Sequence, residues 1–167
     1  HWAYEAIETL AAAGVLEGCG QGRFCPEEEI SRSQMAALLS KLDGVSFSPP
    51  SQATFSDVPT THWGFAAIEE QASRGVFLGC VGDRFCPNDS ISRAHVAVLL
   101  GRARDLPWLS SSTPAFSDVG HSHWAYGAIE AVHQRGFVRG CRDHRYCPAD
   151  LLTRAQAAAL LVDSFGI

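Results

Sequence analysis

The chain opens with an amphipathic segment followed by a loop. Over residues 1–13 the apolar residues fall on one side at the i, i+3 and i+4 spacing of an α-helix: Trp2, Ala3, Ala6, Ile7 and Leu10. Gly14 follows, at a place where glycine readily adopts the left-handed backbone that ends a helix. The pattern predicts a first helix that ends near residue 13 and a glycine-rich loop over residues 18–26.

A second helix is predicted to begin near residue 31. Its apolar positions are Met35, Leu38, Leu39 and Leu42. In a capping box, two side chains at a helix start each satisfy a free backbone N–H group of the other residue. The pairs that fit this box are Ser31 with Gln34 and Thr153 with Gln156. Near the middle of the chain the cap residue is Ser92, and His95 stands three residues later in place of the Gln. We expect this change to weaken the reciprocal bond and to leave the helix start intact.

The same pattern occurs three times at a fixed offset of 61 residues, without a gap. The offset relates Trp2, Trp63 and Trp124; Gly18, Gly79 and Gly140; Phe24, Phe85 and Tyr146; Pro26, Pro87 and Pro148; and Arg32, Arg93 and Arg154. Such self-similarity is typical of a duplicated structural unit. Each copy is predicted to be a helix–loop–helix repeat, and the fold class is therefore mostly α.

Two linkers rich in Ser and Pro separate the copies. We expect repeats at residues 1–42, 55–103 and 116–167, with linkers at 43–54 and 104–115. The second and third repeats open with Phe-Ser-Asp-Val, whereas the first begins directly with its helix. This difference indicates that the chain is a fragment of a longer protein.

Composition and charge exclude two classes of function. The chain is 46% hydrophobic and 19% charged, with a net charge of −5. A negative protein is a poor nucleic-acid binder, because binding to phosphate normally needs a basic face. No apolar run reaches the roughly 18 residues of a membrane span, so we expect no membrane insertion.

Six cysteines form three identical pairs, each six residues apart. The pairs are Cys19 with Cys25, Cys80 with Cys86, and Cys141 with Cys147. Repeated pairs favour disulfides and an oxidising, extracellular compartment. A zinc site would need four ligands, and each loop offers only two cysteines. Closing each loop is expected to contribute about 2–3 kcal/mol in the chain-entropy model.

At these residues the sequence resembles the S-layer homology family. The family's Phe-x-Asp-Val, Trp-led helix, Phe-x-Pro loop and Thr-Arg-Ala-Glu helix start correspond here to FSDV, HWAYEAIETLAAAGVLEGC, GRFCP and ISRSQ. The resemblance implies three repeats around a pseudo-threefold axis with a central three-helix bundle. It also implies non-covalent binding of a cell-wall polysaccharide, often pyruvylated, in grooves between repeats. The sequence departs from the family in its cysteine pairs and in having Gln34, His95 or Gln156 in place of the motif's Glu.

Three arginines are the first candidates for ligand contact. Arg32, Arg93 and Arg154 each fall in the first turn of a predicted second helix, where backbone N–H groups favour an anion. A guanidinium there would offer a bidentate partner to a carboxylate such as a pyruvyl acid. The alternative is an ordinary ion pair with a nearby Asp or Glu.

Other repeated residues have both a structural and a binding interpretation. Trp2, Trp63 and Trp124 could stack on a sugar, but their place on the apolar side of a helix favours core packing. Asp57 and Asp118 are expected to fix a turn, with a groove contact as the second interpretation. Gly18, Gly79 and Gly140 are expected to serve backbone geometry, although glycine also lets a ligand approach closely. His1, His62 and His123 could meet as metal ligands, but we expect them to be ordinary helix-start residues, and no metal or cofactor is predicted.

The sequence predicts a binding module and no enzyme. No nucleophile lies beside a plausible base, and no glycine-rich phosphate loop follows a strand. We expect a non-catalytic, extracellular anchoring module whose partner is an acidic secondary cell-wall polymer. The alternatives are a module that binds other surface proteins and an accessory domain of a secreted hydrolase, each with the glycan site lost.

Overall fold

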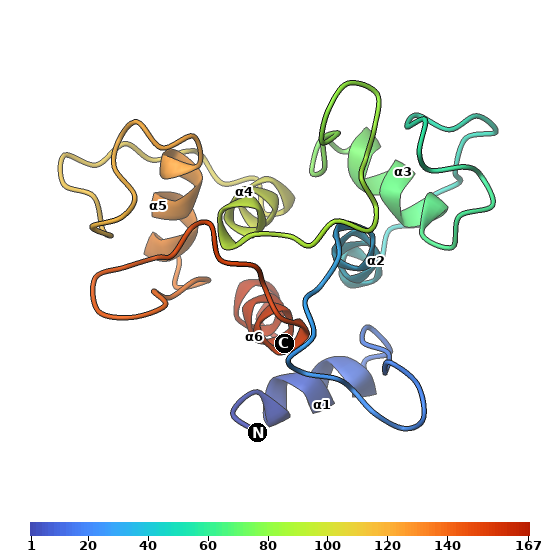
Figure 1. Ribbon diagram of the computed structural model, residues 1–167, viewed down its shortest axis with the longest axis horizontal. Helices are drawn as coiled ribbons and strands as arrows, with labels where there is room; N and C mark the ends of the chain where they lie inside the picture. Colours follow the sequence, from blue (N-terminus) through green and yellow to red (C-terminus); the bar gives the residue numbers. More distant parts are fainter. The chain divides into compact units, whose positions relative to one another are not determined.

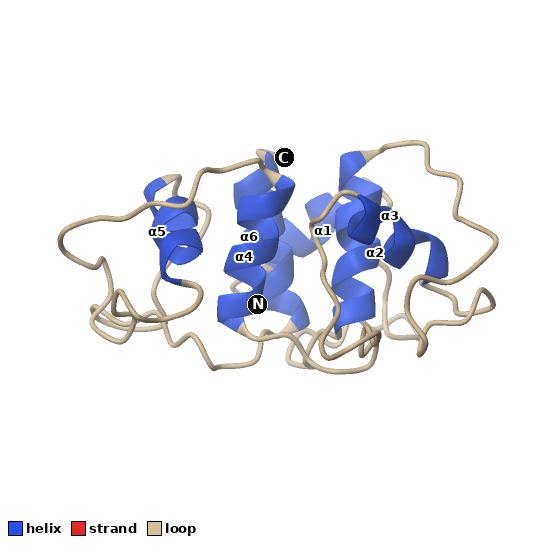
Figure 2. Cartoon of the chain, turned by 90° about the horizontal axis from the view of Figure 1, so that it is seen from above, coloured by secondary structure: helices blue, strands red, loops and turns tan.

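The computed structural model describes residues 1–167 and contains six α-helices and no extended strands (Figure 2). The helices are α1 (Tyr4–Ala12), α2 (Arg32–Asp43), α3 (Phe65–Ser73), α4 (Arg93–Ala103), α5 (Tyr126–Gln134) and α6 (Arg154–Phe165). None of them has the length and apolar character needed to cross a lipid bilayer. The predicted helical repeat fold is confirmed.

Each first helix of a repeat ends at the predicted glycine. Gly14 has a φ of 69°, and its N–H donates to the carbonyl of Ala11 at 3.0 Å. The next N–H, of Val15, donates to the carbonyl of Leu10 at 2.9 Å. These two bonds form a Schellman motif, which only a left-handed residue can close without strain. Gly75 and Gly136 end α3 and α5 in the same way.

Each second helix begins at the predicted cap. The Ser31 hydroxyl accepts the N–H of Gln34 at 3.2 Å, and the Gln34 side chain accepts the N–H of Ser31 at 2.9 Å. The same box is complete at the start of α6. At the start of α4 the Ser92 hydroxyl still accepts the N–H of His95, but the imidazole contacts that hydroxyl at 2.7 Å instead of the backbone. The expected weakening of the reciprocal bond is confirmed, and the helix start is intact.

Helix packing joins one repeat to the next. The pairs that pack together are α2 with α3, α4 with α5, and α6 with α1 (Figure 1). The compact structural element, here called a lobe, is therefore shifted by half a repeat. Lobe A is residues 30–90, lobe B is residues 91–151, and lobe C is residues 152–167 with residues 1–29.

Lobe A forms one compact unit, and lobes B and C together form the other. Within the larger unit, the N–H of Leu152 in lobe C donates to the carbonyl of Ile91 in lobe B at 2.9 Å. The pseudo-threefold axis and the central bundle stay predictions of the resemblance.

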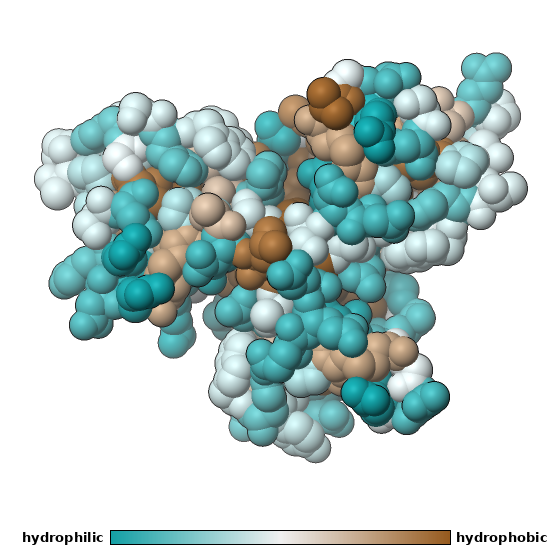
Figure 3. All heavy atoms as spheres, viewed as in Figure 1, coloured by the Kyte–Doolittle hydropathy of each residue, from teal (hydrophilic) through white to brown (hydrophobic).

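The core of each lobe combines the apolar side of two helices with an apolar residue just before the second helix. Fully or almost fully buried residues at matching positions are Leu39, Leu100 and Leu161; Ile68 and Ile129; and Ile30, Ile91 and Leu152. Figure 3 shows the complementary picture, in which hydrophilic side chains cover most of the visible surface and hydrophobic patches interrupt it. Burial of these aliphatic side chains is the main term that stabilises such small lobes.

Lobe A carries a buried polar network where lobe B is apolar. Gln71 of α3 is fully buried and donates to Asp43 of α2 at 3.0 Å, and Arg74 pairs with the same carboxylate. The neighbouring Glu70 accepts a hydrogen bond from Ser40. In α5 the positions of Glu70 and Gln71 are taken by Ala131 and Val132, both buried. The α2–α3 contact is therefore chemically distinct from the α4–α5 contact.

The Phe-Ser-Asp-Val segments fasten the loop that follows the first helix. The Asp57 carboxylate accepts the N–H groups of Phe85 at 2.7 Å and Cys86 at 2.8 Å. The Phe55 ring is buried, with its centroid 5.2 Å from that of Phe85. In lobe B, Asp118 accepts the N–H groups of Tyr146 and Cys147 at 2.8 and 2.9 Å. Both aspartates bond backbone N–H groups, as expected, but these groups belong to a loop 28 and 29 residues further along the chain and not to a local turn.

These hydrogen bonds set the charge state of the two aspartates. Burial disfavours the charged form of Asp57, but the N–H groups of Phe85 and Cys86 outweigh it and hold the pKa of Asp57 below its ordinary value. The pKa of Asp118 is lowered in the same way by Tyr146 and Cys147. A carboxylate with a lowered folded-state pKa stabilises the fold above its unfolded pKa, and this contribution is lost as pH falls through the folded pKa.

We predict that the double variant Asp57→Asn, Asp118→Asn loses about 2 kcal/mol of unfolding free energy per site at neutral pH, because an amide accepts only one of the two N–H groups. Its stability should also fall less than that of the unchanged chain between neutral pH and about pH 3. Urea unfolding over this pH range measures both effects. The exposed Asp143→Asn serves as the control, and a double variant with an unchanged pH profile would contradict the assignment.

Candidate functional site

The repeated tryptophans lie on the surface. Trp2, Trp63 and Trp124 have exposed fractions of 67%, 66% and 61%. The core-packing interpretation is therefore wrong. The reason is local, because α1 begins at Tyr4 and Trp2 precedes the helix whose spacing suggested burial. Each of the three positions offers a wide aromatic face to solvent.

A histidine fixes the backbone beside each tryptophan. The Nδ1 atom of His62 accepts the N–H of Gly64 at 3.0 Å, and the imidazole lies 5.6 Å from the ring of Trp63. His1 and His123 make the same contacts. The imidazole thus satisfies an N–H group at the start of the helix, a role that Ser or Asp usually fills. The repeated His-Trp pair is the sequence feature that marks this contact. From the sequence, the histidine was predicted only to be an ordinary helix-start residue.

In lobe B a second histidine contacts the tryptophan. The imidazole of His95, in the first turn of α4, lies 4.8 Å from the ring of Trp124. Trp124 therefore has an imidazole on both the α4 side and the α5 side, from His95 and His123. His95 stands at the position of the family motif's Glu. The sequence pattern predicts only a weakened cap at His95 and gives no sign of this contact.

The three candidate arginines bind backbone carbonyls of another repeat. The Nε atom of Arg32 donates to the carbonyl of Phe85, and its Nη2 atom donates to that of Leu78, both at 2.8 Å. The guanidinium carbon lies 4.7 Å from the Phe85 ring centroid, within the range of a cation–π contact. Burial lowers the pKa of Arg32, whereas the charges of Asp89 and Asp57 act in the opposite direction.

The other two arginines repeat these contacts. Arg93 donates to the carbonyls of Tyr146 and Arg139 at 2.8 and 2.7 Å. Arg154 donates to those of Phe24 and Glu17 at 3.0 and 2.7 Å. Their exposed fractions are only 9% and 8%. The carbonyl dipoles offset the cost of placing a cation at a helix N-terminus, an explanation that neither the ion-pair nor the ligand interpretation included.

The backbone N–H groups at these helix starts are also occupied. The N–H groups of Arg93 and Ala94 donate to the carbonyls of Asp150 and Pro148. The starts of α2 and α6 are closed in the same way. The free N–H groups that would favour an anion there are therefore already used within the protein.

The loops that receive the arginines are closed by the predicted disulfides. The bridges join Cys19 with Cys25, Cys80 with Cys86, and Cys141 with Cys147. In lobe A the two carbonyls that bind Arg32 belong to Leu78 and Phe85, on the flank and at the end of the bridged loop. A Cβ atom at Gly79 would lie 2.8 Å from the carbonyl oxygen of Arg84, so this position requires glycine for backbone geometry. Gly18 and Gly140 are equally restricted.

The structure thus sorts the candidate residues into two groups. An arginine, a glycine and a cysteine pair meet around one loop in each lobe and hold it in place, and in lobes A and B an aspartate joins them. The tryptophans, with their histidines, point to solvent at the start of the first helices. A pocket of about 380 Å³ in lobe A lies elsewhere, between the linker residues Phe47 and Thr54 and the α3 residues Glu69 and Ala72.

Comparisons with known proteins agree with the resemblance. The S-layer homology domain model matches residues 1–36, 54–97 and 115–158. The chain is 32% identical to Cell surface glycoprotein 1 of Acetivibrio thermocellus over 87% of its length, which is 7% of that protein. It is 30% identical to the Cellulosome-anchoring protein of the same organism over 89% of its length, which is 35% of that protein.

A third relative is named as an enzyme. The chain is 29% identical to Exoglucanase XynX of Acetivibrio thermocellus over 96% of its length, but this is only 15% of that protein. The chain therefore spans a minor part of each of these relatives. The family and its cell-surface relatives confirm the predicted extracellular location at the cell surface.

We predict that Arg93→Met lowers the free energy of unfolding by about 3 kcal/mol, because two buried carbonyls lose a charged donor. Chemical denaturation measures this loss. The control is Arg142→Met in the exposed loop of the same lobe, which should change stability by less than about 0.5 kcal/mol. Equal effects of the two substitutions would show that the carbonyl contacts contribute nothing.

Proposed function

Because the chain belongs to the S-layer homology family, we propose that it is a non-catalytic module that anchors its protein to the cell surface by binding an acidic, pyruvyl-bearing wall polysaccharide. The observation that carries this proposal is the exposure of Trp2, Trp63 and Trp124. The same exposed aromatic ring recurs at three equivalent positions, and exposed apolar surface of this kind is a candidate interaction site. Their flat faces suit the apolar face of a sugar ring.

Lobe B offers the most complete binding surface. Trp124 provides a stacking face, and the imidazoles of His95 and His123 lie within 6 Å of its ring. An imidazole can donate a hydrogen bond to a sugar hydroxyl or to a carboxylate. We assign this cluster as the principal glycan contact and the His-Trp pairs of the other repeats as weaker contacts of the same kind.

The arginines have mainly a supporting role in this proposal. Each guanidinium donates from Nε and once from Nη2 to carbonyls, so the two N–H groups of Nη1 and the second N–H of Nη2 are left for a ligand carboxylate. Their positive charge still favours an acidic polymer over a neutral one. In the same proposal, Asp57, Asp118 and the three loop glycines shape the loops and do not contact the sugar.

We assign no reaction to this chain. The relatives named as enzymes extend far beyond the region that the chain matches, and their activities belong to the proteins as wholes. The similarity of the chain to part of the Cellulosome-anchoring protein and to part of Cell surface glycoprotein 1 supports a holding role. The wall polymer is the proposed partner, and no cofactor is needed for such binding.

We predict that the triple variant Trp2→Ala, Trp63→Ala, Trp124→Ala binds purified wall polysaccharide at least about tenfold more weakly than the unchanged chain, because each truncation removes a stacking face. Its stability should change little, since the rings are exposed. Co-sedimentation with the insoluble wall polymer, over a range of protein concentrations, measures the affinity.

The control for this experiment is Tyr4→Ala, which removes an exposed aromatic side chain outside the repeated His-Trp pairs. It should leave binding unchanged. If the triple variant binds the polymer as strongly as the unchanged chain, the tryptophans are excluded as glycan contacts. If the unchanged chain does not bind the polymer but forms a defined complex with itself or with another surface protein, the result would support the interaction-module alternative.

A further inference from the structure

The charges of the chain are divided unevenly among its lobes. Lobe B contains seven arginines and five acidic residues, whereas lobe C contains two arginines and seven acidic residues. In lobe A, four basic residues stand against six acidic ones. Lobe B is therefore the one positively charged lobe of a chain whose net charge is −5. Four of its arginines fall within residues 135–145, here called the basic loop.

Two positions of this loop differ in chemistry from lobe to lobe. In lobe B they are Arg139 and Arg142, and both side chains are exposed. The repeat offset places Leu78 and Val81 at these positions in lobe A, where they are exposed as well. The arginines are therefore not a requirement of the repeat, because the same loop folds with apolar residues in their place.

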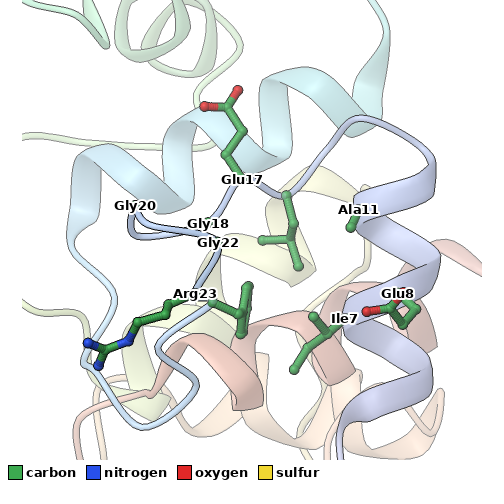
Figure 4. Close-up of a pocket in the computed structure, with 10 residues that line it drawn as sticks. Ile7, Glu8, Ala11, Glu17, Gly18, Gly20, Gly22 and Arg23 are labelled. Atoms are coloured by element: carbon green, nitrogen blue, oxygen red, sulfur yellow. The ribbon is translucent and has the colours of Figure 1, made fainter.

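The equivalent loop of lobe C is not basic either. Figure 4 shows this loop where it borders a pocket beside α1. Glu17 and Gly20 stand at the positions of the two arginines. Residues 13–23 contain a single cation, Arg23, whose side chain extends away from α1 (Figure 4). The clustering of cations is thus specific to lobe B.

A third arginine of the basic loop lacks the acidic partner that its equivalent has in lobe A. There, Arg74 of the loop pairs with Asp43 of α2. The equivalents of these two residues in lobe B are Arg135 and Arg104. A second cation therefore stands where the carboxylate would be, and its guanidinium carbon lies 5.0 Å from the ring centroid of Phe165. The side chain of Arg135 is left exposed.

The basic loop is held in place by its backbone, which leaves its side chains available. Arg93 donates to the carbonyl of Arg139 at 2.7 Å. The N–H and the hydroxyl of Ser117 donate to the carbonyl of His144 at 2.7 and 2.9 Å. The disulfide of lobe B adds a covalent closure. A loop that is already ordered loses little conformational entropy when its side chains meet a ligand.

Three of the four arginines make no ion pair within the protein. Arg145 lies 3.5 Å from the carboxylate of Asp118. The other three, Arg135, Arg139 and Arg142, have no carboxylate within ion-pair distance. Each guanidinium can bind a carboxylate through two parallel hydrogen bonds. Three such groups within eight residues suit a ligand that presents carboxylates repeatedly, as an acidic polymer does.

We propose that Arg135, Arg139 and Arg142 bind the carboxylates of an acidic polysaccharide chain, including carboxylates that belong to no pyruvyl group. The inference rests on the proposed function for the identity of the polymer and adds a second, purely electrostatic contact to it. The negative charge of lobes A and C repels a polyanion, so the attraction is confined to lobe B. Lobe B also contains Trp124, and two linked contacts bind one polymer chain more tightly than either contact alone.

A second copy of the chain is the competing source of carboxylates. Residues 27–29 of lobe C are three consecutive, exposed glutamates. Ion pairs between exposed side chains of two proteins contribute little to their association. A polymer presents many carboxylates in a row, so that a contact that breaks is replaced by the next one along the chain. The polymer is therefore the favoured ligand of the basic loop.

The test uses polygalacturonate, a soluble carboxylate polymer without pyruvyl groups. The unchanged chain should bind it at low ionic strength. The double variant Arg139→Gln, Arg142→Gln should bind at least about tenfold more weakly, because a local positive field concentrates an anionic partner. The variant keeps the fold of the loop, since only the backbone carbonyl of Arg139 holds it. Calorimetric titrations at about 20 mM and about 500 mM sodium chloride measure the affinities, and the difference should disappear at high salt.

The matched control is Arg23→Gln, Arg84→Gln, which removes the same charge from the equivalent loops of lobes C and A. Its affinity for polygalacturonate should stay within about twofold of that of the unchanged chain. Equal weakening by the two double variants would overturn the proposal, as would a failure of the unchanged chain to bind polygalacturonate. Because the probe has no pyruvyl group, neither result depends on whether the tryptophans bind a pyruvyl-bearing polymer.

Sedimentation velocity without any polymer separates the competing source of carboxylates. The unchanged chain should stay monomeric as its concentration rises. Self-association that is abolished by Arg139→Gln, Arg142→Gln would assign the basic loop to a second copy of the chain and would overturn the proposal.

Discussion

The structure depends on a guanidinium of one repeat that holds a loop of the next. In lobe A, Arg32 joins two carbonyls that flank and end a disulfide-closed loop, and its charge lies over the ring of Phe85. The same arrangement recurs at Arg93 and Arg154. Since a repeat supplies the arginine to its neighbour and receives one in its own loop, no repeat completes its fold alone. Helix packing follows the same rule, with each second helix packed on a first helix from another repeat.

This constraint has a consequence for binding. The residues that hold the loops make their hydrogen bonds within the protein. A ligand can therefore best be contacted by exposed side chains that do not hold a loop. Trp124 is the clearest example, because its ring is exposed while imidazoles from α4 and from the start of α5 fix its surroundings. An aromatic ring held in position by its neighbours is what recognition of a flat sugar face requires.

Much of this architecture could be predicted from the sequence. The helix caps at Ser31 and Gly14 and the disulfides depend on contacts within a short stretch or on an exact repeat offset. For Asp57 the sequence predicted bonds to backbone N–H groups, but not that these belong to Phe85 and Cys86 in a distant loop. The burial of Trp2 was predicted wrongly because helical spacing was extended past the true start of α1. The partners of Arg32 could not be predicted, because they are backbone carbonyls 46 and 53 residues away. Every residue has such a carbonyl, so the amino-acid types at these positions do not reveal the contact. The contact of His95 with Trp124 could not be predicted from the sequence either, because it depends on the packing of α4 against α5 of the next repeat.

The central claim is that exposed tryptophans bind an acidic wall polysaccharide. The most direct measurement is a titration of the chain with purified polymer, before and after chemical removal of its pyruvyl groups, followed by tryptophan fluorescence. The account predicts a saturable change in emission with the native polymer and a much weaker one with the depyruvylated polymer. Binding of the native polymer without any change in tryptophan emission would contradict it.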